Sequence, residues 1–143
     1  MKKTNPFISG NITPFPTAHG RGLAGMLMGS GAGYFIELPG EKSIYISGDT
    51  VMTETVRQVL NGLRPDISIL NAGTAVLDFG RPILMPLEEQ LDFIKTAPGK
   101  VIAVHMEAFN HCLTTRDMLR NAVSKEGLSD KVMIPTDGEL MEF

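Results

Sequence analysis

The sequence contains a single cysteine, Cys112, and no tryptophan. One cysteine cannot form an internal disulfide, which is typical of a protein in a reducing compartment. No apolar run approaches the roughly 20 residues that a membrane span needs. Two lysines follow Met1, but no apolar segment comes behind them, so a signal peptide is not expected. These absences predict a cytoplasmic protein that has no membrane partner.

An excess of basic residues is also missing. The 13 lysines and arginines are outnumbered by 16 aspartates and glutamates, which gives a net charge of −3. A nucleic-acid-binding protein usually shows the opposite balance, so nucleic acid is not an expected partner. With 143 residues, 43% of them hydrophobic, the chain is predicted to fold as one domain over residues 1–143. Residues 1–11 are polar and are expected to be irregular.

Polar side chains follow four β-prone segments: Asp49 follows 43–47, Asn71 follows 66–70, His105 follows 100–104 and Asp137 follows 131–134. In open α/β sheets, ligands bind outside the carboxyl ends of the strands. If these strands are parallel neighbours, the four side chains share one rim of the sheet. This convergence is the main functional indication in the sequence.

Helical patterns alternate with these strands. Apolar residues recur at helical spacing after Asp49, from Pro86 to Pro98-Gly99, and from Thr114 to Gly127. Before them, 12–17 and the pair 34–38 and 43–47 are predicted strands, and 140–143 is predicted as the last strand. The expected fold is therefore α/β, with a mixed, largely parallel sheet and helices on one face. Nothing obvious in the sequence covers the other face.

Each candidate side chain has a plainer interpretation beside the functional one. Asp49 suits a helix N-cap as well as a ligand role, and both can hold together. His105 is a candidate metal ligand or general base, or a hydrogen-bonded structural histidine. His19 carries little weight alone. His111 beside Cys112 lacks the spaced pattern of a structural zinc site, and Cys112 is interpreted as a small buried thiol rather than a nucleophile.

The segment from Gly20 to Gly33 matches G-x-G-x-x-G at its start, in Gly20-Arg21-Gly22-Leu23-Ala24-Gly25. A dinucleotide fingerprint should open a helix, and further glycines follow here, so a flexible loop is favoured. With Arg21 as counter-charge, this loop is a candidate anion site. Asp and His on one rim favour metal-assisted hydrolysis instead, with zinc, manganese or iron as the metal.

Three short motifs, in this order, resemble the later motifs of the metallo-β-lactamase superfamily: Thr17-Ala18-His19, Ser47-Gly48-Asp49-Thr50 and Val104-His105-Met106-Glu107. The likeness is strongest to its cytosolic, lactonase-like hydrolase branch and runs from about Ile12 to the end of the chain. The family fold is a four-layer αββα sandwich of two similar halves, and this chain resembles the carboxyl-terminal half. The family's first motif, His-x-His-x-Asp-His, is absent from the sequence.

The resemblance implies a dinuclear site in which His19 binds the first metal, Asp49 bridges both and His105 binds the second. Asp49 and His105 would then be catalytic, and Asn71, His111 and Arg21 are candidate substrate-binding residues. The implied reaction is hydrolysis of a small ester- or lactone-like substrate. Three hypotheses follow: a hydrolase half completed by a complementary amino-terminal half, a non-catalytic homodimer, and a small-anion-binding module that uses the Gly20–Gly33 loop.

Overall fold

The computed structural model describes residues 4–76, 82–107 and 110–143. Its strands form one seven-stranded sheet in the order β1-β2-β3-β4-β5-β6-β7. In chain order the elements are β1 (Asn5–Phe7), β2 (Gly10–Ala18), α1 (Gly22–Leu27), β3 (Ser30–Glu37), β4 (Ile44–Ile46), α2 (Glu54–Gln58) with the π-helical turn η1 (Val59–Leu63), β5 (Ile67–Asn71), α3 (Leu87–Thr96), β6 (Lys100–Val104), α4 (Arg116–Lys125) and β7 (Val132–Met133).

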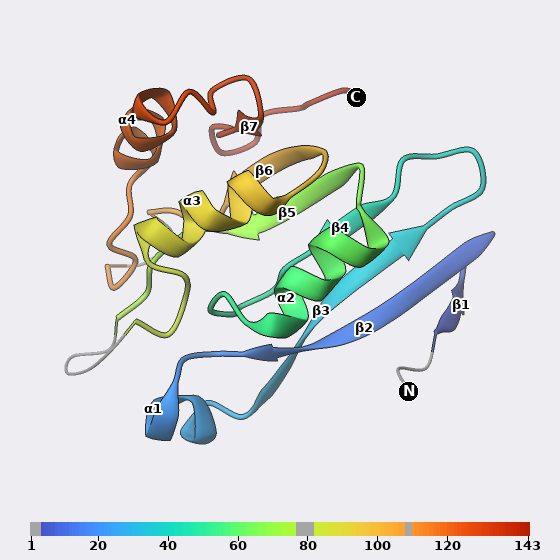
Figure 1. Ribbon diagram of the computed structural model, residues 1–143, viewed down its shortest axis with the longest axis horizontal. Helices are drawn as coiled ribbons and strands as arrows, with labels where there is room; N and C mark the ends of the chain where they lie inside the picture. The colour runs from blue at the N-terminus through green and yellow to red at the C-terminus, as the bar shows by residue number, and fades with distance from the viewer. Residues whose placement is uncertain (1–3, 77–81, 108–109) are drawn as a thin grey trace.

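The sheet is mixed, as predicted (Figure 1). Strands β1 to β4 pair antiparallel, and β4 to β7 pair parallel. Each parallel step is bridged by one of the helical segments that the sequence predicted. Two antiparallel steps separate β2 from β4, so β2 runs in the same direction as β4, β5, β6 and β7. The carboxyl ends of these five strands therefore lie along one edge.

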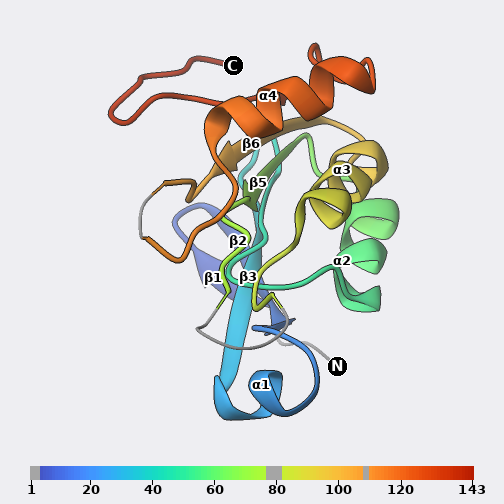
Figure 2. The same ribbon diagram turned by 90° about the vertical axis from the view of Figure 1, so that its left-hand side faces the viewer.

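The helices cover one face of the sheet. Figure 2 shows α2 and α3 on that face, with α4 beyond them at the β6–β7 side. The buried core lies in this layer and includes Phe35, Tyr45, Leu70, Phe93 and Leu119. The rings of Tyr45 and Phe93 stack at a centroid distance of 6.4 Å. Burial of the Tyr45 phenol raises its pKa.

The opposite face carries isoleucines, and none of the described helices lies over it (Figure 2). Side chains alternate between the faces of a strand, so the neighbours of the core residues point away from the helices. Paired positions on this face include Tyr34 with Ile46, Ile46 with Ile69, and Ile69 with Ile102. Tyr34 is 40% exposed, and Ile46 and Ile69 are only partly buried. The face predicted to lack cover is thus apolar.

Three local predictions need correction. Strand β1 and the start of β2 occupy part of segment 1–11, because Asn5 pairs with Ile12 and Phe7 with Gly10. The predicted strand at 140–143 is absent from the described carboxyl-terminal segment, where β7 is the last strand. The Gly20–Gly33 segment is not simply a loop, since α1 and the first residues of β3 lie within it.

Candidate functional site

Four of the predicted site residues stand at the carboxyl ends of strands that run in one direction. His19 directly follows β2, Asp49 follows β4, Asn71 ends β5 and His105 directly follows β6. The topology therefore places them along one edge of the sheet, as the strand ends predicted for Asp49, Asn71 and His105; His19 was a candidate through the family resemblance. Asn71 shares the parity of Ile67 and Ile69, so it lies on the isoleucine face at this edge.

Asp49 is held by Asn71. The Asn71 side-chain amide donates to Oδ1 of Asp49 across 2.6 Å. The backbone supports this contact, because the amide of Asn71 donates to Oγ of Ser47 across 3.2 Å. Gly48 lies between Ser47 and Asp49 and turns the chain there with φ +64°. A Cβ at Gly48 would lie 2.8 Å from the carbonyl oxygen of Ala32. The glycine of this motif is therefore required by both conformation and space.

Asp49 does not cap helix α2. The N-cap is Thr53, whose Oγ1 accepts a hydrogen bond from the amide of Val56 across 3.2 Å. Residues 50–52 separate Asp49 from this cap. Of the two roles that the sequence left open, capping is therefore excluded, and the carboxylate remains at the edge of the sheet.

Backbone hydrogen bonds hold the His19 segment beside the Asp49 segment. The amide of Ala18 donates to Oγ1 of Thr50 across 3.1 Å. The carbonyl oxygen of Ala18 accepts from the amides of Val51 and Gly20, both at 2.9 Å. The residues that flank His19 and Asp49 are thus joined directly, although β3 lies between β2 and β4 in the sheet.

His105 occupies an unusual backbone conformation. Its φ is +66° and that of Glu107 is +59°, in the left-handed region that non-glycine residues rarely adopt. Such strain occurs where the surrounding structure enforces it, often at functional sites. Gly73 packs so closely that a Cβ there would lie 2.7 Å from the carbonyl oxygen of His105. The Sγ of buried Cys112 lies 4.0 Å from Nδ1 of His105.

An arginine that the sequence analysis missed braces this turn. Arg116, the first residue of α4, bonds through its guanidinium to the carboxylates of Glu107 and Asp137 and to the carbonyl oxygen of Pro135. Its hydrogen bond to Glu107 is the main cause of a raised Arg116 pKa. A cation at a helix N-terminus opposes the helix dipole. That mismatch was the signal in the sequence that Arg116 has carboxylate partners.

A cavity of about 430 Å³ opens beside His105. It is lined by residues 103–106 at the end of β6, by Arg116, and by residues 135–138 after β7. Asp137, the fourth polar residue predicted for this edge, is therefore part of its wall. Small-molecule sites range from about 300 to 1,000 Å³, so the cavity is large enough for a small substrate.

Arg21 and His111, the other two candidate substrate-binding residues, make contacts elsewhere in the fold. The Arg21 guanidinium donates to Oε1 of Glu89 across 2.6 Å and to the carbonyl oxygen of Met52 across 3.2 Å. The bond to Glu89 connects the residue before α1 to α3, so Arg21 has a structural role. His111 is exposed, and its carbonyl oxygen accepts from the amide of Val76 across 3.2 Å.

The edge does not contain a complete metal site. Among the residues that the structure describes, no three His, Cys, Asp or Glu side chains are grouped so that they could hold a metal ion. His19, Asp49 and His105 supply nitrogen and oxygen donors of the types that zinc, manganese and iron accept. The donor types suit a divalent metal, but in the described part of the chain they are not gathered into a group that could hold one.

Comparison with known proteins gives the context for these edge residues. No family model matches the sequence. The UPF0173 protein YddR of Bacillus subtilis is 37% identical over 128 residues, which are 87% of this chain and 50% of YddR. The crystal structure of isothiocyanate hydrolase from Delia radicum gut bacteria is 37% identical, with a TM-score of 0.90 over 100% of this chain and 58% of that one.

Other solved structures define the fold. A possible metal-dependent hydrolase from Veillonella parvula is 28% identical, with a TM-score of 0.87 over 96% of this chain and 55% of that one. The metallo-β-lactamase fold protein YhfI of Bacillus subtilis shares the fold at 15% identity, with a TM-score of 0.67 over 96% of this chain and 51% of that one. This chain has half of a metallo-β-lactamase fold. It spans about half the length of the relatives that it matches.

Two of these relatives are hydrolases by name: one is an isothiocyanate hydrolase and the other a possible metal-dependent hydrolase. The likeness extends over nearly the whole chain, as the sequence motifs indicated. Within the described residues, no helix is long and apolar enough to span a membrane.

Proposed function

We propose that this chain is the carboxyl-terminal half of a metal-dependent hydrolase of the metallo-β-lactamase superfamily. The observation that carries the proposal is the Asn71-to-Asp49 hydrogen bond of 2.6 Å, at an edge that His19 and His105 share. Helix capping does not explain Asp49, and the contact orients its carboxylate at the position where this fold collects polar residues.

The proposed metal ligands are His19 for a first metal, Asp49 for both metals and His105 for a second. Zinc, manganese and iron all accept this donor set. Bound metal would supply an activated water at neutral pH. The ligands that are still missing belong to the complementary half, because His-x-His-x-Asp-His is absent from this sequence.

The chain's own residues would position and enclose the reaction. Asn71 fixes one oxygen of Asp49, which leaves the carboxylate in a single orientation. The Glu107–Arg116–Asp137 network holds the strained turn at His105. The cavity of about 430 Å³ beside His105 would receive the substrate.

The proposed substrates share an electrophilic carbon that water attacks. Esters and lactones are the first class, as the superfamily resemblance implies. Isothiocyanates are the second, because a relative that is 37% identical is an isothiocyanate hydrolase. Both classes contain compounds small enough for a cavity of this size.

The isoleucine face, which none of the described helices covers, is the proposed seat of the complementary half, although its Ile67 and Ile102 are already buried. A broad apolar surface on one face of a sheet marks an interaction site. The face ends at Asn71, so a second sheet placed on it would bring its own ligands to the edge beside Asp49. A second copy of this chain is the alternative occupant, and it would give a non-catalytic homodimer. Anion binding by the Gly20–Gly33 segment is less favoured, because Arg21 already pairs with Glu89.

The test is a zinc titration followed by native mass spectrometry. We expect weak zinc binding by the chain alone and tight binding after it is mixed with the part of YddR that lies outside the region this chain matches. Asp49→Asn should abolish the tight binding, whereas Asp117→Asn, an exposed residue of α4, should leave it unchanged. A metal-free homodimer that ignores the added half would reject the proposal, as would equal zinc binding by Asp49→Asn.

A further inference from the structure

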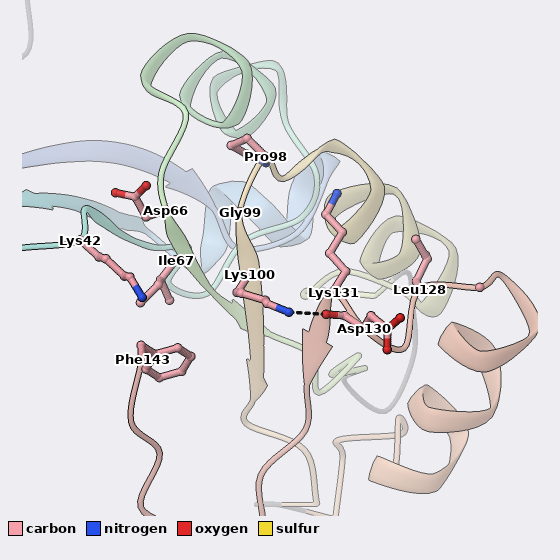
Figure 3. A pocket seen from close by; sticks show the side chains of 11 residues that line it. Lys42, Asp66, Ile67, Pro98, Gly99, Lys100, Leu128, Asp130, Lys131 and Phe143 are labelled. Carbon is pink, nitrogen blue, oxygen red and sulfur yellow. Dashed lines mark hydrogen bonds between the residues drawn. The ribbon is translucent and has the colours of Figure 1, made fainter.

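A second cavity, of about 520 Å³, lies at the opposite edge of the sheet (Figure 3). Its lining includes Ile67 and Lys100, the first residues of β5 and β6, and Lys131, just before β7. Asn71 ends β5 and His105 follows β6 at the other end of these parallel strands. The volume lies within the range of small-molecule sites, about 300–1,000 Å³.

Three lysines from separate segments line the cavity: Lys42, Lys100 and Lys131. The amine of Lys100 donates to the carbonyl oxygen of Asp130 across 2.5 Å. The amine of Lys131 donates to the carbonyl oxygen of Lys95, near the end of α3, across 2.9 Å. Burial lowers the pKa of Lys131, so its charge lacks full hydration. A bound anion would stabilise this group of cations.

Two aspartates also line the cavity, but they do not neutralise its lysines equally. Asp66 accepts two hydrogen bonds from Ser43, one from the amide at 2.8 Å and one from the hydroxyl at 2.7 Å. Figure 3 shows Asp66 apart from Lys100 and Phe143. Asp130 meets Lys100 through its backbone oxygen rather than its carboxylate. Three lysines against two aspartates leave the lining side chains with a net positive charge, although Lys42, after the hydrogen bonds from Ser43, also contributes to the lowered pKa of Asp66.

The remaining wall is apolar. Ile67 is buried, Leu128 is partly buried and the Phe143 side chain is 49% exposed. In Figure 3 the Phe143 ring lies on the same side of the cavity as the Lys42 amine and Ile67. A half-exposed aromatic ring offers a flat surface on which another ring can stack, and aromatic pairs are stabilising beyond the area that they bury.

We propose that this cavity binds a small aryl carboxylate, with the carboxylate at Lys42 and Lys100 and the ring against Ile67 and Phe143. Bonds between ammonium and carboxylate groups are stronger than neutral hydrogen bonds. A bare inorganic anion would leave the apolar wall in contact with water. A neutral aromatic would remove the amines from water without a charged partner. The site does not depend on the proposed metal centre.

The experiment is an NMR-monitored titration of the intact chain with benzoate, benzamide and acetate. We expect saturable benzoate binding at least about tenfold tighter than that of either comparison compound, since one charge-assisted bond corresponds to about that factor. Resonances of Lys100, Ile67 and Phe143 should shift. Lys42→Gln and Phe143→Ala should each weaken benzoate about tenfold.

Two control variants make the result decisive. Lys125→Gln removes an exposed lysine on α4 outside the cavity and should not change benzoate affinity. Asp49→Asn alters the opposite edge and should also have no effect. The proposal is overturned if benzamide binds as tightly as benzoate, if Lys125→Gln weakens benzoate as much as Lys42→Gln does, or if the shifted resonances belong to the edge of Asp49.

Discussion

Asn71 donates its side-chain amide to the carboxylate of Asp49 across 2.6 Å; Asn71 ends β5, and Asp49 follows the parallel neighbour β4. The register of β4 and β5 sets this distance. Ile46 pairs with Ile69, and the segments beyond this pair lead to Asp49 and Asn71. Partners that orient a ligating carboxylate typically contribute about 10–100-fold to metal affinity. The pair is therefore a direct probe of the proposed site.

Asn71→Leu should weaken zinc binding by the reconstituted protein about 10–100-fold, because the carboxylate of Asp49 loses its orienting donor. The fold should persist, since the backbone bond from Asn71 to Ser47 does not depend on the side chain. Competition with a zinc chelator would measure the change. Asn121→Leu, at an exposed position of α4, is the control and should bind zinc normally. Unchanged affinity in Asn71→Leu would remove Asn71 from the site.

Gly73→Ala should displace His105. The added Cβ would lie 2.7 Å from the carbonyl oxygen of His105 and 3.1 Å from Sγ of Cys112. Overpacking of this kind costs about 1–3 kcal/mol, and urea denaturation would measure it. Gly62→Ala is the matched control, because a Cβ there meets nothing within 4 Å. That variant should be neutral or slightly more stable. A Gly73→Ala protein with normal stability would show that this packing around His105 is loose.

The edge residues could be predicted from the sequence because their placement needs only local information. Asp49, Asn71 and His105 each end or follow a short apolar strand, and strands of this kind align in an α/β fold. The helices after these strands were predictable for the same reason. The separate assignment of Asp49 as a cap was left open, and Thr53 fills that role.

The supporting contacts could not be predicted, because they join residues far apart in the chain. Arg116 meets Asp137 across 21 positions, and Gln90 meets Ala72 across 18. Periodicity marks Gln90 only as a polar residue on a helix, yet it is fully buried. Strand β1 was missed because a three-residue edge strand has too few residues to show alternation.

The buried side chain of Gln90, on α3, hydrogen-bonds to the loop after β5. Its side-chain amide donates to the carbonyl oxygens of Ala72 and Met85 and to Oγ1 of Thr74. Gln90→Met keeps the approximate volume but takes this donor from the carbonyl oxygen of Ala72, whereas the Thr74 hydroxyl still donates to Met85, so we expect a cost of about 1–3 kcal/mol. Thermal or urea unfolding would measure it. Gln58→Met, on α2 and near Glu54, should cost much less, so equal losses would contradict the structural role assigned to Gln90.

Ser43 makes the stability of the fold depend on pH through Asp66. Its hydroxyl and amide hydrogen-bond the carboxylate and hold the pKa of Asp66 below its usual value. The charged form therefore stabilises the fold above the unfolded-state pKa, about 3.9. That stabilisation is lost as the pH falls through the lower folded-state value.

Ser43→Ala should reduce stability at neutral pH, and its difference from the wild type should shrink in acid as Asp66 becomes protonated in both proteins. Urea midpoints measured from neutral pH into the acid range would show this, with Ser129→Ala as an exposed control. A difference that stayed constant with pH would assign the effect of Ser43 to packing rather than to the Asp66 carboxylate.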